Sequence, residues 1–386
     1  MIGLLAIILA LVPSYLIRFH IAGLPTTLLE VLIVAFLFII VIVQIQNRFS
    51  GIKKIKQLGS INYAIILFLT AGVIGTLMSP DKLSALGQFK AYLLEPVLLF
   101  YGVILTVKQK EQSLRAPILA LFWSAVIISA LGIFQHYSFI FLPIRFWGNG
   151  EELTRIVSVF EYPNALSLYL APLLGFFTAL WFADYDLTKR RWTGILALAI
   201  IGWALILTFS RGAWISAVIG ILFILFKEFE FKRVILPILI AGVLLLLLPG
   251  VRDRLSLGLS DASSSAHYEL LKVGFNKVTH SPIFGNGLAG FRTTQAESGY
   301  AGEILNYPHN FLLNFWLELG ILGLISFIWI IILAFYKASQ NNRELALAVS
   351  VYLIIVLIHG LVDVPYFKND LSVLFWFMLS LLYIKF

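Results

Sequence analysis

Long apolar segments alternate with short polar connectors along the whole chain. A membrane-spanning helix needs about 20 mostly apolar residues, and on that template the pattern predicts twelve spans. They are expected at residues 2–17, 26–45, 61–78, 88–106, 116–137, 164–183, 193–209, 212–226, 233–249, 311–335, 344–361 and 370–385. Apolar and polar residues do not alternate as they do in the strands of a membrane barrel. The predicted fold class is therefore an all-α polytopic membrane protein with about 12 transmembrane helices.

Two connectors are much longer than the rest. One covers residues 138–163, and the other covers 250–310 between the ninth and tenth spans. The chain is thus expected to divide into spans one to nine at 1–249, a loop of short helices at 250–310, and spans ten to twelve at 311–386. Within the longer loop, apolar residues recur at helical spacing over 264–279, which predicts a helix there.

The composition agrees with a membrane location. Of the 386 residues, 60% are hydrophobic and only 12% are charged, with a mean hydropathy of +0.95, whereas soluble proteins carry about 25% charged residues. These values exclude a disordered chain, which needs low hydrophobicity and high charge, and they disfavour a soluble enzyme. The sequence contains no cysteine, so it has no disulfide framework and no thiolate metal site.

The net charge of +8 orients the protein and does not indicate a nucleic-acid partner. More than half of the 28 Lys and Arg residues lie in the short connectors that follow the even-numbered spans. Short basic connectors face the cytoplasm under the positive-inside rule, so both termini are expected to be cytoplasmic. The two long loops and all six histidines then fall on the outer side, where we expect the polar chemistry.

Arg211 lies in Thr208–Trp214, at the outer junction of two spans that almost no residue separates. A guanidinium there can bind a phosphate through two parallel hydrogen bonds, or it can anchor a helix end at the membrane interface. Arg155 precedes a second outer helix start, Glu161–Asn164, and is expected near the same outer cavity.

A polar stripe opens the tenth span. Asn310, Asn314 and Glu318 follow one another at i, i+4 and i+8 on an otherwise apolar helix, and polar residues in a span face protein or water rather than lipid. These three residues are candidates for contact with the substrate, and His309 stands at the mouth of this stripe. An imidazole suits the removal of a proton from a hydroxyl near neutral pH, while a cap at the interface is the simpler alternative.

The long outer loop carries cations and a glycine-rich segment. Arg254, His267 and Arg292 are its candidates for contact with an anionic or glycan substrate. Gly285–Gly290 matches G-x-G-x-x-G, but no strand precedes it, so we interpret it as a turn and not as a dinucleotide site. No two histidines stand at i and i+4 and no carboxylates cluster, so no metal is expected.

Four short segments with recognisable motifs occur in order along the chain. They are Glu161–Ala165, the Ser-Arg-Gly stretch Thr208–Trp214, the glycine-rich Pro282–Phe291 and the His-Asn stretch His309–Gly323. In this order, with a large outer loop before the last of them, the chain resembles the O-antigen ligase/polymerase family of bacterial envelope glycosyltransferases. The resemblance covers most of the chain and is closest over residues 155–323.

The resemblance implies a GT-C-like glycosyltransferase of the bacterial inner (plasma) membrane, with its active site facing the periplasm or exterior. Its donor would be a glycan on undecaprenyl pyrophosphate, and its acceptor a glycan or lipid, either lipid A-core or a second lipid-linked repeat unit. Such enzymes use no metal, cofactor or nucleotide sugar. In the family, arginines hold the donor pyrophosphate and the histidine of the His-Asn motif helps activate the acceptor hydroxyl. Arg211 and His309 match these positions.

One position departs from the family pattern. A second arginine is expected in the long loop ahead of the glycine turn, where this chain has His267. Arg254 or Arg292 can supply the second pyrophosphate contact instead. Displacement of the pyrophosphate from the opposite face would invert the anomeric configuration.

The resemblance leaves a ligase, a polymerase and a protein glycosyltransferase open. A polytopic transporter or flippase of lipid-linked substrates is the alternative from another class, since it too would have many spans and basic inner connectors. A transporter is expected to carry its ionisable residues near the bilayer midplane, whereas those of this chain gather in the outer halves of the spans. Membrane lipids are expected partners in each case.

Overall fold

The computed structural model describes residues 1–21, 23–107, 112–147, 154–228, 247, 249–256, 262–299, 302, 304–341 and 344–384. These residues fold as two compact units. Unit 1 contains Met1–Ala120, Ser265–Asn342 and Gly360–Phe386, and unit 2 contains Leu121–Ser264 and Arg343–His359.

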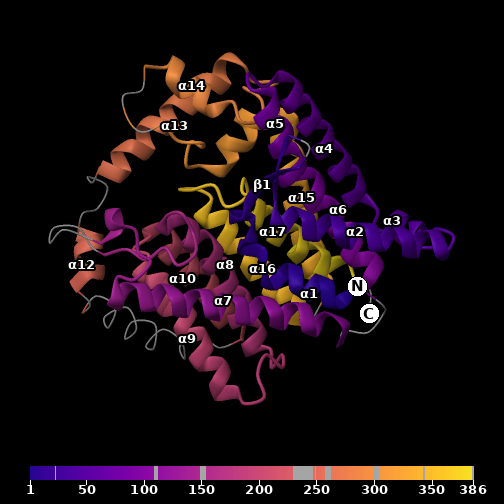
Figure 1. Cartoon of the computed structure of the whole chain (residues 1–386), viewed down its shortest axis with the longest axis horizontal. Helices are drawn as coiled ribbons and strands as arrows, with labels where there is room; N and C mark the ends of the chain where they lie inside the picture. The colour runs from indigo at the N-terminus through magenta and orange to yellow at the C-terminus, as the bar shows by residue number, and fades with distance from the viewer. Residues whose placement is uncertain are drawn as a thin grey trace. The chain divides into compact units, whose positions relative to one another are not determined.

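Unit 1 is a helical bundle with one small hairpin (Figure 1). Its N-terminal elements are α1 (Ile2–Ala10), the 3-10 helix η1 (Val12–Leu16), β1 (Arg18–Ile21), β2 (Leu24–Thr27), α2 (Leu28–Gln46), α3 (Ile52–Lys56), α4 (Ser60–Met78), α5 (Lys82–Gln88), the π-helical turn η2 (Phe89–Leu94) and α6 (Glu95–Thr106). Its later elements are α13 (Ala262–His280), α14 (Phe291–Glu297), α15 (Phe311–Ser339) and α17 (Asn369–Tyr383).

Unit 2 is built from helices whose small residues allow close packing. Its elements are α7 (Gln112–Ser138), the 3-10 helix η3 (Ile144–Phe146), α8 (Pro163–Phe182), α9 (Arg191–Leu207), α10 (Arg211–Glu228), α12 (Pro249–Ser256) and α16 (Glu344–His359). Helices α8, α10 and α16 pack against one another. The side chain of Ile355 on α16 lies against both Gly175 of α8 and Gly220 of α10, and such glycines let apolar helices approach closely.

The predicted fold class, an all-α polytopic membrane protein, is confirmed. Among the described residues, six helices are long and apolar enough to cross a membrane: Leu28–Gln46, Ser60–Met78, Lys82–Thr106, Leu114–Ser138, Pro163–Phe182 and Phe311–Ser339. Three shorter apolar helices are α9, α16 and α17. The predicted span at 233–249 lies almost entirely outside the described residues, so the total of twelve stays a prediction, as does the division at residues 249 and 310.

The first predicted span is wrong as one continuous helix. Helix α1 ends at Ala10, and a 3-10 turn with Pro13 near its start follows, because proline supplies no N–H to the helix ladder and its ring collides with the preceding turn. The chain then forms an antiparallel hairpin that pairs Arg18 with Thr27. The apolar pattern had predicted only a connector at this hairpin.

Glu30, one of the few acids predicted inside a span, is neutralised within unit 1. Its carboxylate forms an ion pair with Lys90, whose Nζ lies 2.7 Å from Oε2, and accepts a hydrogen bond from Asn369 Nδ2 at 3.0 Å. Thr27 caps the same helix by accepting from the Glu30 N–H. A buried charge is tolerable when it is paired and hydrogen-bonded, so this cluster joins α2, η2 and α17 structurally.

Aromatic side chains form the core of unit 1. Phe68, Phe315, Tyr366 and Trp376 are fully buried and contact one another edge to face or tilted. The hydroxyl of Tyr366 accepts from Trp376 Nε1 at 2.9 Å and donates to the carbonyl of Tyr92 at 2.9 Å. Burial raises the pKa of Tyr366, so the hydroxyl remains protonated. The loop after α16 is thereby fixed to the bundle.

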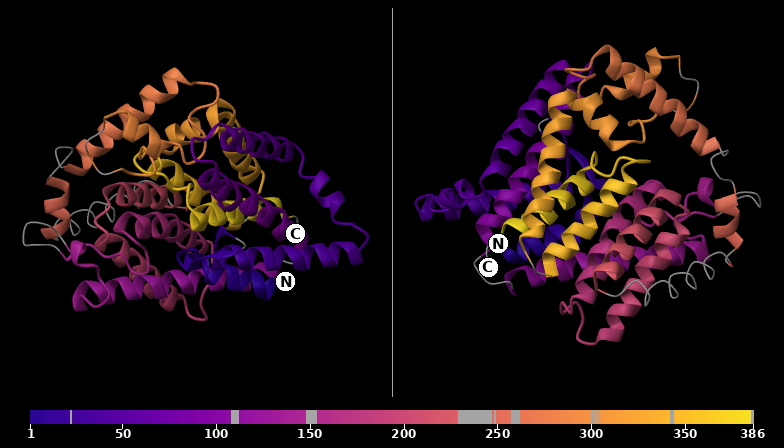
Figure 2. Two further views of the ribbon diagram at one scale, coloured as in Figure 1. Left: turned by 45° about the horizontal axis from the view of Figure 1, so that its top comes forward. Right: turned by 180° about the vertical axis from the view of Figure 1, so that it is seen from behind.

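Helix α15 runs alongside α4 (Figure 2) and is broken at Gly320, whose φ is 67° and ψ is −174°. The turn Pro282–Gly290 docks at this break and at the end of α4. Its hydrogen bonds run from Ile321 N to Ile283 O at 3.1 Å, from Asn286 N to Leu317 O at 2.6 Å, from Leu288 N to Gly75 O at 3.0 Å, and from Ser79 Oγ to Leu288 O at 2.6 Å. Only glycine readily adopts the Gly320 conformation.

Replacing Gly320 by alanine should therefore destabilise the protein strongly. An alanine there would hold a strained backbone conformation, at a cost of about 1–3 kcal/mol. Its methyl group would also collide with the carbonyl oxygen of Ile283. Gly59→Ala is the matched control, because Gly59 also has a positive φ but an added Cβ there meets nothing within 4 Å. Thermal unfolding of both purified variants should show the larger loss for Gly320→Ala. Equal losses would contradict the docking role of this break.

Candidate active site

His309 sits directly before α15 and contacts an aspartate from another part of unit 1. Its Nδ1 lies 3.3 Å from Oδ1 of Asp363. The residue has a positive φ of 54°, and only 18% of its side chain is exposed. Because Nδ1 faces the carboxylate, Nε2 is the ring atom left to exchange a proton with a substrate.

Asp363 is held in place by the loop between α16 and α17. Its Oδ1 also accepts the Val364 N–H at 2.9 Å. The carbonyl of Gly360 accepts from the Phe311 N–H at 2.9 Å, which ties this loop to the start of α15. Asp363 was not among the residues selected from the sequence. Its position in the connector that follows the eleventh predicted span was the available signal.

His267, which stands where the family pattern has an arginine, lies against His309. The two imidazole rings are stacked with centroids 4.0 Å apart and an angle of 14° between their planes. The predicted helix over 264–279 is present as α13, and it carries His267 to this position. The stack and the Asp363 contact together constrain the orientation of the His309 ring. Phe275, on the apolar face of this helix, is 60% exposed.

The polar stripe beneath His309 lies inside the protein. Asn310 caps α15, since its Oδ1 accepts the Leu313 N–H at 3.0 Å and its Nδ2 donates to the Leu361 carbonyl at 3.1 Å. Asn314 is fully buried, and neither polar atom of its amide has a hydrogen-bond partner among the described residues. Glu318 is 1% exposed. Among these three residues, only Asn310 has surface that a substrate can reach.

The glycine-rich segment forms a structural turn, and most of its N–H groups donate within unit 1. Glu318 Oε2 accepts the Ala289 N–H at 3.5 Å. The remaining N–H groups with described acceptors are those of Gly285, Asn286, Leu288 and Gly290, which donate to carbonyls within unit 1. Because these donors are used internally, they cannot cradle a phosphate, and the interpretation as a turn agrees with the structure.

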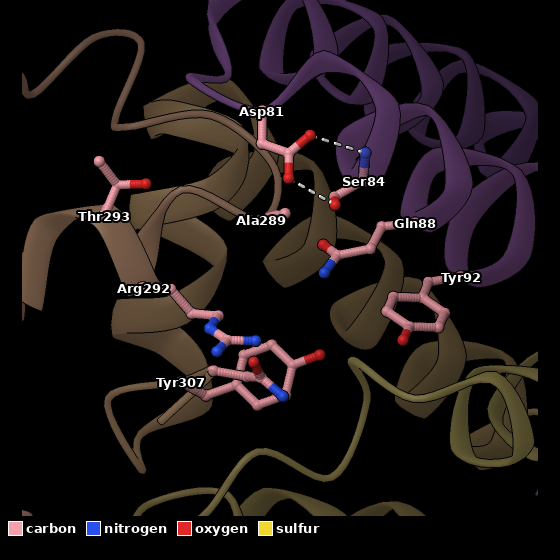
Figure 3. A pocket seen from close by; sticks show the side chains of 9 residues that line it. Asp81, Ser84, Gln88, Tyr92, Ala289, Arg292, Thr293 and Tyr307 are labelled. Carbon is pink, nitrogen blue, oxygen red and sulfur yellow. Dashed lines mark hydrogen bonds between the residues drawn. The ribbon is translucent and has the colours of Figure 1, made fainter. Parts of the chain in front are cut away.

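Arg292 lies on α14, on the wall of a pocket of about 390 Å³ within unit 1 (Figure 3). The side chain of the other candidate in the long loop, Arg254, lies outside the described residues. No group of three His, Asp or Glu side chains in the described parts of the chain is arranged to hold a metal.

Arg155 and Arg211 both belong to the region of unit 2 around the α9–α10 turn. Helix α9 ends at Leu207 and α10 begins at Arg211, so the connection is as short as expected. Arg155 donates from Nε to the Thr208 carbonyl at 2.8 Å and from Nη2 to Asn164 Oδ1 at 2.9 Å. The structure thus brings Arg155 to the turn that presents Arg211.

The sequence candidates therefore fall into two groups. His309, His267, Asn310, Asn314, Glu318 and Arg292 lie in unit 1, while Arg155 and Arg211 lie in unit 2. The fold and these groups define a helical polytopic membrane protein in which a histidine–aspartate pair stands at the start of a spanning helix.

Comparison with known proteins shows that the chain is similar to glycan-transferring enzymes. Residues 196–328, which contain every candidate except Arg155, match the family model described as O-Antigen ligase. The resemblance seen in the motifs is confirmed: this segment matches the model of the O-antigen ligase family.

Three relatives extend the match. A Haemophilus influenzae protein described only as uncharacterized is 23% identical over 360 residues, covering 80% of this chain and 88% of that protein. The ComP-specific O-oligosaccharyltransferase of Acinetobacter baylyi is 28% identical over 229 residues, covering 53% of this chain and 39% of that protein. The O-antigen ligase of Pseudomonas aeruginosa is 26% identical over 267 residues, covering 67% and 61%. The chain thus spans less than two thirds of the two relatives with a named activity. The family and these relatives support a membrane enzyme that transfers glycans.

The Arg155–Asn164 contact should contribute measurably to the stability of unit 2. Hydrogen bonds to charged groups contribute about 1.5–3 kcal/mol, so a double-mutant cycle of Arg155→Ala and Asn164→Ala in denaturant unfolding should give a coupling energy above 1 kcal/mol. The exposed Arg191–Asp184 pair is the control and should couple by about 0–1 kcal/mol. If both cycles give the same coupling, Arg155 does not fix the α9–α10 turn.

Proposed function

We propose that the protein transfers a glycan from undecaprenyl pyrophosphate to an acceptor hydroxyl at the outer face of the bacterial inner membrane, as an O-antigen ligase does. The His309–Asp363 pair is the observation that carries this proposal. A histidine whose Nδ1 is engaged by a carboxylate has its tautomer and ring orientation fixed, and its Nε2 can act as a general base. The family match supports the substrate class.

In the proposed reaction, His309 Nε2 removes the proton of the acceptor hydroxyl. The acceptor oxygen attacks the anomeric carbon of the donor sugar, and the bond from that carbon to the pyrophosphate oxygen breaks. Undecaprenyl pyrophosphate leaves with the electron pair. Attack from the face opposite the leaving group inverts the configuration, and the imidazolium that forms is stabilised by Asp363.

Arginine side chains supply the stabilisation of the leaving group, and the proposal requires no metal or cofactor. Arg211 is the principal candidate, because it begins α10 directly after a tight turn and its guanidinium suits bidentate contact with a phosphate. Two of the donors of Arg155 already bond within unit 2, so we assign Arg155 to positioning this turn. Arg254 remains a candidate for the second pyrophosphate contact.

Asn310 and Glu318 hold the segments around the base in place. Asn310 starts α15 and bonds the loop that carries Asp363. Glu318 holds the end of the glycine turn through Ala289. His267 replaces a cation with a ring that stacks on His309, which supports an orienting role.

Substitutions at the base and the arginine should abolish transfer. Removing a general base costs about 10²–10⁴ in rate, and removing a donor that stabilises transition-state charge costs about 10²–10³. His309→Ala and Arg211→Ala should therefore each lower transfer from an undecaprenyl-pyrophosphate glycan by at least about a hundredfold. Lys272→Ala, an exposed cation of α13, is the control and should retain full activity. Each variant is first checked for insertion and unfolding temperature. Full activity in His309→Ala would exclude the proposed mechanism.

Asp363→Asn tests the partner of the base separately. A hydrogen bond to a charged group contributes about 1.5–3 kcal/mol. Its loss in the transition state corresponds to a decrease in kcat of roughly ten- to hundredfold. The measurement is kcat at saturating donor and acceptor. An unchanged kcat would remove Asp363 from the mechanism while leaving His309 as the base.

Omitting the acceptor distinguishes the branches of the family. With donor alone, a polymerase extends the glycan into a ladder, whereas a ligase needs a separate acceptor and gives a single shift. We expect no product from the donor alone and a single shift once the acceptor is added. Uptake of the donor into vesicles without transfer would instead favour a transporter.

A further inference from the structure

The pocket lined by Arg292 is a further candidate ligand site in unit 1. Its volume of about 390 Å³ lies within the range of roughly 300–1,000 Å³ that is usual for small-molecule sites. One wall comes from α5, the residue before it and η2. The other wall comes from α14 and the segments that flank it. Figure 3 shows Gln88 and Tyr92 on the first wall and Arg292 and Tyr307 on the second.

Nearly every lining side chain can form hydrogen bonds. The lining residues are Asp81, Ser84, Gln88, Tyr92, Ala289, Arg292, Thr293, Asn306 and Tyr307. Hydroxyl, amide, carboxylate and guanidinium groups offer donors and acceptors in several directions. This is the combination that matches the ring of hydroxyls on a sugar, and two tyrosine rings add apolar surface for its faces.

Gln88 provides a separate sign that a ligand belongs here. Its Oε1 is buried and accepts no hydrogen bond from any described residue. A buried acceptor without a donor destabilises the folded protein, and native proteins rarely leave one without a partner. A hydroxyl of a bound ligand would satisfy this atom.

The charges of the pocket favour a sugar over a phosphate. Arg292 is a cation, but Asp81 on the facing wall is an anion. The carboxylate of Asp81 accepts from Ser84 N at 3.0 Å and Ser84 Oγ at 2.6 Å, and these hydrogen bonds lower its pKa. An ionised carboxylate repels pyrophosphate, whereas sugar hydroxyls can bond to the carboxylate and the guanidinium alike.

The pocket lies next to the proposed base. Tyr307, which lines it, is two residues before His309, so their Cα atoms are at most about 7 Å apart. The Tyr307 hydroxyl donates to the Phe367 carbonyl at 2.6 Å, and this bond fixes the wall near the loop that carries Asp363.

We propose that this pocket binds a sugar ring of the acceptor glycan and so presents an acceptor hydroxyl to His309. The assignment to the acceptor rests on the function proposed above. The affinity for a sugar is a property of the pocket itself and can be tested without turnover.

The first experiment measures binding by saturation-transfer NMR on the full chain in nanodiscs. The probes are free glucose, galactose, N-acetylglucosamine and galacturonate at millimolar concentration, with inorganic pyrophosphate as competitor. At least one sugar should give a signal that pyrophosphate does not displace. Gln88→Ala and Arg292→Ala should each lower that signal at least threefold, while the exposed controls Asn276→Ala and Lys272→Ala should preserve it. Displacement by pyrophosphate, or a signal unchanged in Gln88→Ala, would overturn the proposal.

The second experiment separates the acceptor from the donor. The loss of one neutral hydrogen bond, about 0.5–1.5 kcal/mol, should raise the acceptor KM of Gln88→Ala by about two- to tenfold with the donor KM and the unfolding temperature unchanged. A rise in the donor KM alone would overturn the acceptor assignment. If the wild-type protein binds the sugar but transfers no glycan to any acceptor, the proposed function fails and the sugar site stands.

Discussion

The break in α15 at Gly320 is the constraint on which the arrangement of unit 1 depends. A helix that stops its hydrogen-bond ladder inside a bundle must find other partners for its peptide groups, and here the Pro282–Gly290 turn supplies them through Ile283 and Asn286. The half of α15 before the break begins at Phe311, two residues after His309, and the turn leads directly into α14. The docking of this turn on α15 therefore positions both the base and one wall of the pocket.

Buried polar groups in unit 1 have different numbers of polar partners. Glu30 forms an ion pair with Lys90 and accepts a hydrogen bond from Asn369, whereas Glu318 holds a single long hydrogen bond from Ala289 and Asn314 has none from the described residues. Such groups are costly in an apolar bundle. Their concentration along α15, in contrast to the aromatic core formed around Trp376, indicates that this helix was shaped by chemistry as well as by packing.

The sequence pattern located the helices well because their apolar lengths reflect burial directly. The expected span at 311–335 is Phe311–Ser339, and the expected loop helix at 264–279 is Ala262–His280. The break at Gly320 was not expected, since its cause is a turn thirty residues earlier in the chain. Asp363 was missed for the same reason: it is 54 residues from His309, and only the loop after α16 brings them together. The pocket was also missed, because nothing in the sequence distinguishes Gln88 from other glutamines before the fold buries its side-chain carbonyl oxygen.

The place of Arg211 as the first residue of α10 links folding to substrate binding. The N-terminus of a helix carries a partial positive charge, so a cation there is unfavourable by about 0.3–1 kcal/mol. In the proposed mechanism, this weaker helix start accompanies the positive charge that would bind the donor. An anionic donor held at Arg211 would relieve that repulsion, and selection for greater stability at this position would therefore act against affinity for the donor.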